Sequence, residues 1–199
     1  MKAFWNQRYA DNDYAYGTTP NLFLKSQLAL IPKGKILFVA EGEGRNAVYA
    51  AQQGFEVVAF DSSEEGKNKA QRLAKQHQVG IDYQVADIED IQFEANSFDA
   101  VVFIFAHFPA EVREAYYQKT LSFLKLGGHI VFEGFGKAQI HLNSGGPKQV
   151  DMLFSETEIK AIFSNVDFKF LETTDIHLDE GPFHQGKANV VRFLGMQQL

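Results

Sequence analysis

The chain has 199 residues, of which 45% are hydrophobic and 22% are charged, the ordinary balance of a globular protein. Its length favours one domain spanning residues 1–199. It contains no cysteine, which excludes disulfides and thiolate metal ligands, and its six histidines never occur in H-x-x-x-H spacing, so we expect no metal site. The formal net charge of −6 and the lack of a Lys or Arg cluster argue against a nucleic-acid partner.

Two features of the sequence bear on location. No secretory signal follows the first residues, and the longest apolar run, residues 100–106, is far too short to cross a bilayer. The sequence therefore predicts a cytoplasmic protein with no membrane partner.

Residues 1–24 are rich in aromatic side chains and precede the first predicted strand: Trp5, Tyr9, Tyr14 and Tyr16 fall within twelve positions. One interpretation is a helical arm packed on the domain surface. The other is a lid over a ligand, because aromatic rings attract a desolvated cation such as a sulfonium by about 1–2 kcal/mol. Residues 21–30 then predict a helix with Asn21 as its N-cap.

A strand, a turn and a helix follow between residues 36 and 54. Residues 36–39 form a continuous apolar run, typical of a strand buried on both faces. Gly42 and Gly44 come next, where the backbone must turn tightly. Helical spacing starts at Arg45 and ends at Gly54. Residues 55–60 predict a second strand, with Asp61 at its carboxyl end.

This unit predicts a ligand that carries an anionic group and a ribose. The start of the helix offers free N–H groups and a partial positive charge to a carboxylate or a phosphate. Asp61 can accept hydrogen bonds from both ribose hydroxyls. Residues 42–47, GEGRNA, fit the G-x-G-x-x-G/A fingerprint, although the same glycines can serve only to close a tight turn. The candidate ligands are a nicotinamide dinucleotide and S-adenosylmethionine.

The next two predicted elements are an exposed helix over residues 62–78 and a third strand over residues 81–85. Asp87 follows the third strand as Asp61 follows the second. It can accept a hydrogen bond from an adenine amino group, or it can be an ordinary turn or capping residue.

Residues 100–106 form the most apolar run and predict the central strand of the sheet. His107 follows at its carboxyl end, where open α/β sheets bind ligands. It is a candidate general base or acceptor-binding group, and the alternative is a loop histidine bonded to a backbone carbonyl. Residues 111–124 predict a helix closed by Gly127 and Gly128, and residues 129–132 predict a fifth strand that ends at Glu133.

The last third of the chain continues the alternation of strands and helices. Residues 134–149 form a glycine-rich loop long enough to cover a site. Residues 155–163 predict a helix, with Ser155 and Glu158 in capping-box spacing. Residues 168–176 and 188–194 predict two strands, and the loop between them carries His184, a second candidate base. The alternation predicts an α/β fold, in which helices cover both faces of a mostly parallel sheet closed by an antiparallel pair.

Dehydrogenase chemistry fits these residues poorly. A short-chain dehydrogenase would need a Tyr-x-x-x-Lys pair, and no tyrosine of this chain has a lysine four positions later. A dehydrogenase with a separate substrate domain would need a longer chain. These two kinds of dehydrogenase are therefore disfavoured, and the two candidate ligands are distinguished by the resemblance that follows.

Four stretches of the sequence resemble class I S-adenosylmethionine-dependent methyltransferases, most of all the tellurite-resistance and thiopurine methyltransferase-like group. They are WNQRY (5–9) with YGTTPN (16–21), EGEGRNA (41–47), VAFD (58–61), and LGG (126–128) before the strand ending in Glu133. The likeness extends to GGP at 145–147 and to the terminal hairpin, so it covers nearly the whole chain.

The resemblance implies a three-layer Rossmann-like sandwich, whose seven-stranded, mostly parallel sheet has the order 3-2-1-4-5-7-6 with the last strand antiparallel. Phe38 and Ala40 depart from the usual acidic residue and glycine of the family, and Glu41 is the candidate replacement for the missing carboxylate. The implied cofactor-binding residues are Ala40, Glu41, Gly42, Gly44, Arg45, Asn46, Asp61, Ser62, Asp87, Ile88, Phe105 and Ala106, with Trp5, Tyr9 and Tyr16 from the arm.

The predicted function is methyl transfer from S-adenosylmethionine to a small-molecule acceptor, such as a thiol or a chalcogen compound. Residues 106–109, AHFP, stand where a DNA amino-methyltransferase shows Asn/Asp-Pro-Pro-Tyr, which favours a small acceptor. Two alternatives stay open. One is a nucleotide-dependent oxidoreductase built on the same ligand unit, and the other is a methyltransferase-fold protein that binds the nucleoside without catalysis.

Overall fold

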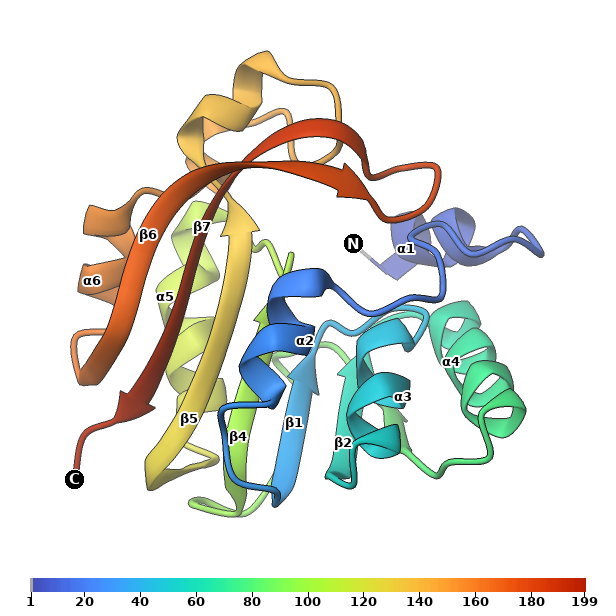
Figure 1. Cartoon of the computed structure of the whole chain (residues 1–199), viewed down its shortest axis with the longest axis horizontal. Helices are drawn as coiled ribbons and strands as arrows, with labels where there is room; N and C mark the ends of the chain where they lie inside the picture. The colour runs from blue at the N-terminus through green and yellow to red at the C-terminus, as the bar shows by residue number, and fades with distance from the viewer. Residues whose placement is uncertain (1) are drawn as a thin grey trace.

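The computed structural model describes residues 2–199, and Met1 lies outside the described part of the chain. Its strands form one seven-stranded sheet in the order β3-β2-β1-β4-β5-β7-β6 (Figure 1). The strands are β1 (Lys35–Val39), β2 (Glu56–Asp61), β3 (Asp82–Val85), β4 (Phe98–Ile104), β5 (Leu124–Phe135), β6 (Val166–Asp179) and β7 (Gln185–Gln197). The α-helices are α1 (Lys2–Tyr9), α2 (Leu22–Leu28), α3 (Arg45–Gln52), α4 (Glu64–Gln76), α5 (Ala110–Leu121) and α6 (Glu156–Ile162). Two 3-10 helices, η1 (Lys137–His141) and η2 (Val150–Met152), lie between β5 and α6.

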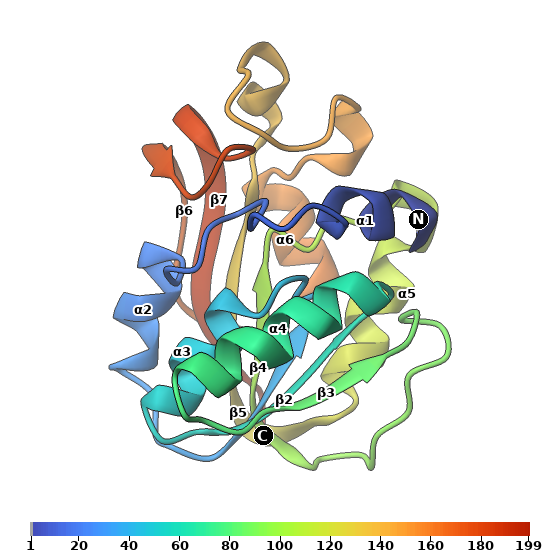
Figure 2. The ribbon, with the colours of Figure 1, turned by 90° about the vertical axis from the view of Figure 1, so that its right-hand side faces the viewer.

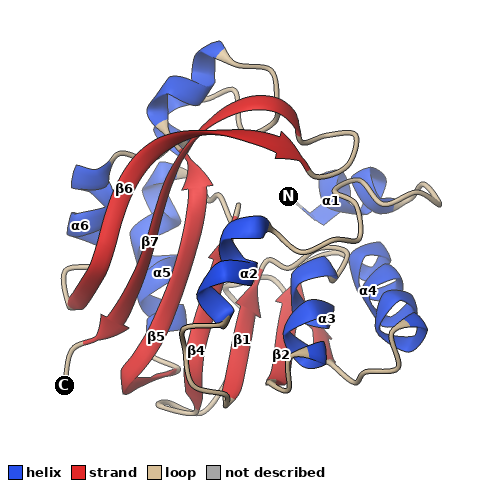
Figure 3. Cartoon of the chain, in the orientation of Figure 1, coloured by secondary structure: helices blue, strands red, loops and turns tan. Residues whose placement is uncertain are grey.

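The first five strands run parallel, and β7 runs antiparallel to both of its neighbours, β5 and β6. Helices α2, α3 and α4 cover one face of the sheet, and α5 and α6 cover the other (Figures 2 and 3). This arrangement confirms the predicted three-layer Rossmann-like sandwich, its strand order and its single antiparallel strand. Because the parallel strands end at the same edge, residues that follow β1, β2, β4 and β5 meet there.

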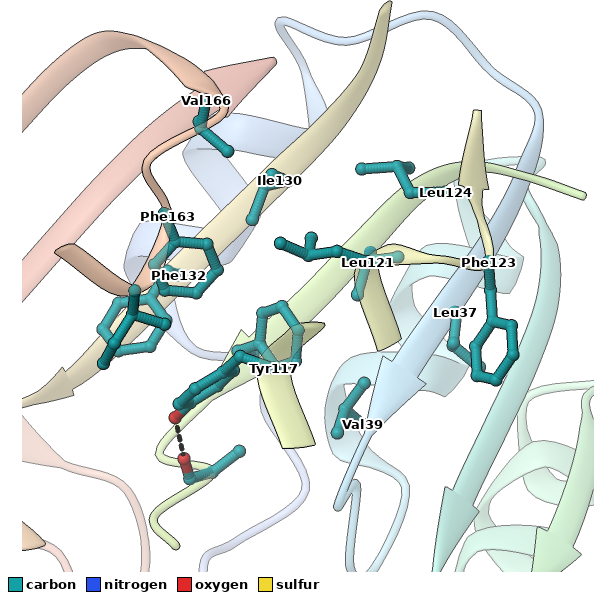
Figure 4. Close-up of a cluster of buried hydrophobic side chains, with 14 of the residues drawn as sticks. Leu37, Val39, Tyr117, Leu121, Phe123, Leu124, Ile130, Phe132, Phe163 and Val166 are labelled. Carbon is teal, nitrogen blue, oxygen red and sulfur yellow. Dashed lines mark hydrogen bonds between the residues drawn. The ribbon is translucent and has the colours of Figure 1, made fainter. Parts of the chain in front are cut away.

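The core on the α5 and α6 face is strongly aromatic (Figure 4). Phe132 of β5 stacks on Phe193 of β7 with ring centres 5.2 Å apart, and Tyr117 of α5 lies edge-on to Phe132 at 6.0 Å. The Tyr117 hydroxyl donates a 2.6 Å hydrogen bond to the carbonyl of Ala106. This buried bond fixes the backbone immediately after β4, at the edge of the sheet where a ligand would bind.

Two helix starts follow the sequence prediction closely. The side chain of Asn21 accepts a 2.9 Å hydrogen bond from the amide of Leu24, so Asn21 caps α2. Ser155 and Glu158 form the predicted capping box at the start of α6. Both caps satisfy amides that have no partner within the helix.

The predicted end of the helix over residues 111–124 is wrong. Helix α5 ends at Leu121, and Leu124, expected in its last turn, begins β5. Gly127 and Gly128 therefore lie inside a strand and close no helix. Leu124 is buried in the core and pairs with Phe98, and the register then shifts before His129 pairs with Ala100. Leu124 therefore adopts the strand conformation that buries it in the sheet, although the local sequence has helical spacing.

The C-terminal hairpin is longer than predicted. Strands β6 and β7 remain paired as far as Asp179 and Gln185, whereas β7 pairs with β5 only as far as Phe135 and Val190. The tip of the hairpin therefore extends beyond the sheet and curves towards α1 (Figure 1). Among residues 2–199, no helix is both long enough and apolar enough to cross a membrane.

Gly44 and Gly54 offer a matched test of how tightly α3 packs on α4. Their φ angles are 89° and 88°, but a Cβ on Gly44 would lie 2.5 Å from the Cβ of Ala70, whereas a Cβ on Gly54 would meet nothing within 4 Å. We expect Gly54→Ala to lower the free energy of unfolding by about 1–2 kcal/mol, the cost of a left-handed backbone. Gly44→Ala should cost about 1–3 kcal/mol more, because α4 must move. Urea unfolding followed by circular dichroism measures both, and equal losses would contradict this packing.

Candidate active site

The turn after β1 is made of glycine because other parts of the chain approach it closely. Gly42 has a φ of 66°, and a Cβ there would lie 2.6 Å from the Tyr9 hydroxyl oxygen. Gly44 is crowded in the same way by α4. Ala40, at the end of β1, also has a positive φ of 53°. The turn is therefore tight, and the N-terminal arm lies against it.

The start of α3 is capped by the chain itself. Oε1 of Glu41 accepts hydrogen bonds from the amides of Asn46, at 3.0 Å, and Ala47, at 2.8 Å. The expectation of free amides at this helix end is thus wrong for these two groups. Burial raises the pKa of Glu41 to about 7. A ligand carboxylate at this end would compete with Glu41, whereas a ligand cation would be attracted by it.

Asp61 lies beside the turn, as the sequence predicts. Its Oδ2 accepts a hydrogen bond from the amide of Gly42 at 3.1 Å, and its Oδ1 accepts one from Ser63 at 2.9 Å. Burial raises the pKa of Asp61 to about 6, with a smaller contribution from the charge of Asp87. Each carboxylate oxygen keeps a lone pair for a further donor. Near this end, Ser62 is half-buried, Ile88 is buried and Asp87 is exposed.

The N-terminal arm spans the site from α4 to the tip of the β6–β7 hairpin. The rings of Trp5 and Tyr9 stack at 5.5 Å, and Tyr9 lies edge-on to Tyr16 at 6.5 Å. Glu43 accepts hydrogen bonds from the amides of Ala15 and Tyr16. Glu43 is itself held by a buried ion pair with Lys69 of α4, at 2.7 Å. The arm is thereby fixed to the turn that carries Gly42.

His107 is held by the backbone through both ring nitrogens. Its Nδ1 lies 2.9 Å from the carbonyl oxygen of Met152, and its Nε2 accepts a 3.1 Å hydrogen bond from the amide of Phe135. Burial lowers the pKa of His107 to about 4, which keeps the ring neutral. Neither nitrogen is free for a substrate, so the geometry matches the alternative of a backbone-bonded loop histidine.

His184 lies differently, at the tip of the hairpin. Its Nδ1 is 3.4 Å from Oε2 of Glu180, and the same oxygen accepts a 2.7 Å hydrogen bond from Arg45. Burial lowers the pKa of His184 below its ordinary value. Although burial opposes ionisation of Glu180, its hydrogen bonds to His184 and Arg45 lower its pKa to about 2. A carboxylate at Nδ1 favours the neutral tautomer whose Nε2 can accept a proton.

Aromatic rings surround the imidazole of His184. Tyr16 lies 4.5 Å from it, Phe105 4.7 Å and Phe135 5.4 Å, measured between ring centres. Phe105 stacks on Phe135 at 4.5 Å. Phe105 and Ala106 follow β4, so His184 is brought to the carboxyl edge of the sheet. Among residues 2–199, Nε2 of His184 has no hydrogen-bond partner.

Sequence reasoning missed the importance of Asn21, Glu133 and Glu180. The amide nitrogen of Asn21 donates to Glu133 at 2.7 Å and to Glu180 at 3.0 Å, and so joins the helix cap to β5 and the hairpin. Burial raises the pKa of Glu133 to about 7. The available signal was an acidic residue directly after an apolar strand. No group of three His, Asp or Glu side chains within residues 2–199 is arranged to hold a metal ion.

Two surface hollows lie away from this cluster. One, of about 580 Å³, lies between the arm and α4 and is lined by residues such as Asp11, Glu65 and Arg72. The other, of about 460 Å³, lies at the amino ends of the strands, near Lys35 and Asp99. The concentration of buried ionisable groups, rather than either hollow, marks the candidate site.

The His107 geometry predicts a pH dependence of stability. Because the ring has a pKa of about 4 when folded and about 6.5 when unfolded, the unfolded chain binds the extra proton between these values. Stability should therefore fall as the pH drops from 6.5 to 4, by about 3 kcal/mol for this group. His107→Gln, which can donate and accept but does not titrate, should lose this part of the dependence. Unfolding at several pH values measures it, and the exposed His177→Gln is the control.

Comparison with known proteins relates part of the chain to a known family. Residues 36–128 match the methyltransferase domain family. A tRNA (uracil(54)-C(5))-methyltransferase from Pyrococcus horikoshii is 28% identical over 116 residues, which are 51% of this chain and 28% of that protein. A 2-heptyl-1-hydroxyquinolin-4(1H)-one methyltransferase from Mycobacteroides abscessus is 28% identical over 144 residues, 69% of this chain and 62% of that protein. The matches thus span less than two thirds of either relative.

The fold of the chain is similar to that of solved structures. The crystal structure of TehB from Haemophilus influenzae superposes with a TM-score of 0.74 at 16% identity, covering 99% of this chain and 67% of that one. At this identity the likeness concerns the fold alone. Residues 36–128 are thus similar to methyltransferase domains, and the order of the sheet is the one that the resemblance to class I S-adenosylmethionine-dependent methyltransferases implies.

Proposed function

We propose that the chain methylates a small-molecule acceptor at a protic nucleophile, such as a thiol or another chalcogen, with His184 as the general base. One observation carries this proposal. His184 is neutral, is bound by Glu180 through Nδ1, and keeps Nε2 free beside Phe105 at the end of β4. His107, the other candidate, has both nitrogens engaged.

The residues at the edge of the sheet fit S-adenosylmethionine. The carboxylate of Asp61 can still accept hydrogen bonds from ribose hydroxyls. Glu41 accepts the hydrogen bonds from α3 through Oε1, which leaves Oε2 for a ligand. We assign the methionine part to Ala40, Glu41 and Gly42, and the adenine to Ser62, Asp87 and Ile88. When bound, this cofactor supplies an electrophilic methyl group on a sulfonium. The other assigned residues are Gly44, Arg45, Asn46, Phe105 and Ala106, with Trp5, Tyr9 and Tyr16 from the arm.

The residues around His184 determine what it can do with a proton. Nε2 of His184 would accept the S–H or O–H proton of the acceptor, while the bound cofactor would supply the methyl group to the resulting nucleophile. The resulting imidazolium is stabilised by the Glu180 carboxylate, which Arg45 and Asn21 hold in place. General-base assistance of this kind contributes about 10²–10⁴-fold to the rate.

The walls of the site favour an organic acceptor over an inorganic oxyanion. Phe105, Phe135 and Tyr16 present rings around His184, which suits a flat or apolar molecule. The buried carboxylates of Glu41, Asp61 and Glu133 would repel an anion. The Mycobacteroides relative, named for a hydroxyquinolinone, supports a small planar acceptor. The fold likeness to TehB is the support for the tellurite-resistance and thiopurine methyltransferase-like subgroup.

We further propose that residues 1–24 act as a lid on a single methyltransferase domain. The arm contacts the turn through Tyr9 and the hairpin through Arg8, whose guanidinium lies 3.9 Å from the ring centre of Phe183. A cofactor that binds between Tyr9 and the turn with Gly42 would require this arm to open. The cytoplasm remains the predicted location.

Replacement of Asp61 tests the donor site. Asp61→Ala should weaken S-adenosylhomocysteine binding by about 1–3 kcal/mol, because the ribose loses a charged acceptor. Isothermal titration measures the affinity, and Asp82→Ala, at the opposite end of the neighbouring strand, should leave it unchanged. Unaltered affinity in Asp61→Ala, or binding of NADH in place of the sulfur ligands, would contradict the proposed donor site.

Replacement of the two histidines tests the base. His184→Gln should lower kcat by about 10²–10⁴-fold and leave S-adenosylhomocysteine affinity nearly unchanged, whereas His107→Gln should retain most of the activity. The wild-type kcat/KM should fall as the pH drops through the lowered pKa of His184, because the protonated ring cannot act as a base. Activity is measured with labelled donor over a panel of thiols and phenols. Equal losses in the two variants would count against His184.

A further inference from the structure

Glu133 has a buried carboxylate oxygen that nothing in the described chain satisfies. The residue is 1% exposed at the end of β5, and its Oε1 accepts the hydrogen bond from Asn21. Its Oε2 is buried and has no hydrogen-bond partner among residues 2–199. The nearest cation is Nη1 of Arg192, at 3.8 Å, which is beyond hydrogen-bond distance. A buried carboxylate oxygen without a hydrogen-bond donor lowers the stability of the fold unless a ligand supplies the donor.

Among residues 2–199, the charged side chains around this oxygen leave an excess of one carboxylate. Three acidic side chains, Glu133, Glu172 and Glu180, share two guanidinium groups, those of Arg45 and Arg192. Arg45 is committed to Glu180 at 2.7 Å, and Nε of Arg192 is committed to Glu172 at 2.8 Å. The neighbouring His184 is neutral and adds no positive charge. A cation would therefore complete Glu133 in its ionised form.

The position of Glu133 makes this partner a ligand of the proposed site. The carbonyl oxygen of Glu133 accepts a 2.7 Å hydrogen bond from the amide of Phe105, which follows β4. Through Asn21, the carboxylate is linked to Glu180 and so to His184. Glu133 thus lies at the same edge of the sheet as the aromatic rings and the proposed base.

We propose that Oε2 of Glu133 binds an ammonium group of a ligand of this site. A hydroxyl group would supply a hydrogen bond without balancing the charge, and an anion would be repelled, whereas an ammonium supplies both the donor and the charge. Two sources share this chemistry, and both rest on the proposed function: the α-ammonium of the methyl donor and an amino group on the acceptor.

The pH dependence of binding follows from the raised pKa of Glu133. Burial raises this pKa to about 7, with Glu180 adding to the effect and Arg192 and Arg45 opposing it. An ammonium favours the ionised carboxylate, so binding releases a proton near neutral pH. Affinity for the ammonium ligand should therefore rise as the pH increases through about 7.

Isothermal titration of Glu133→Gln tests the proposal. The ligands are S-adenosylhomocysteine and its analogue with hydrogen in place of the α-amino group, then phenethylamine and its hydroxyl counterpart 2-phenylethanol. The control is Glu114→Gln, which removes an exposed carboxylate of α5, outside the charge cluster around Glu133. Should Glu133→Gln fail to fold in a thermal melt, Glu133→Asp keeps the charge and withdraws it by one methylene.

If the donor supplies the ammonium, Glu133→Gln loses about 10- to 100-fold in affinity for S-adenosylhomocysteine and nothing for the analogue without the amino group. If the acceptor supplies it, the same loss appears for phenethylamine and not for 2-phenylethanol. In either case, proton release measured in buffers of different ionisation enthalpy disappears in Glu133→Gln and persists in Glu114→Gln.

Unchanged affinity for both ammonium ligands in Glu133→Gln would overturn the inference. So would equal losses for each ammonium ligand and its counterpart, because a purely structural role does not distinguish them. Failure of the wild type to bind S-adenosylhomocysteine would instead count against the proposed function, and the phenethylamine titrations would still decide the role of Glu133.

Discussion

The buried ion pair between Arg45 and Glu180 joins the two ends of the candidate site. Arg45 begins α3 and Glu180 lies at the tip of the terminal hairpin, yet their charged atoms are 2.7 Å apart and almost wholly buried. Removing one partner of such a pair leaves an uncompensated charge, which typically costs about 3–5 kcal/mol. Glu180 in turn holds His184 and Asn21. The position of the proposed base therefore depends on a contact with the first helix after the glycine turn.

The electrostatics of the site are set by carboxylates that the chain only partly neutralises. Glu43 and Glu180 have ion-pair partners in Lys69 and Arg45, whereas burial raises the pKa values of Glu41 and Glu133 to about 7. A sulfonium or an ammonium entering such a site meets groups that ionise in its favour. This pattern suits a cationic methyl donor, and the start of α3 receives its anionic cap from Glu41.

The N-terminal arm is held by contacts with the glycine turn, with α4 and with the terminal hairpin. Glu43 and Lys69 fix its middle to the turn and to α4, and Tyr9, which stacks on Trp5, lies against Gly42. Because Gly42 has no side chain, the Tyr9 hydroxyl can approach the turn directly. The glycine that looked typical of a ligand-binding turn thus also serves contact with the chain's own arm.

The sequence by itself determined the elements and their order. Apolar runs, the caps at Asn21 and Ser155, and the acidic residue after β2 are local features, and local features are visible in sequence. The tertiary structure alone decided which charges are satisfied. Asn21 and Glu133 are 112 positions apart, and Arg45 and Glu180 are 135 apart. Such distant partners leave no local pattern. For the same reason, only the fold shows that His107 is tied at both nitrogens while His184 keeps one free, and that Leu124 belongs to a strand.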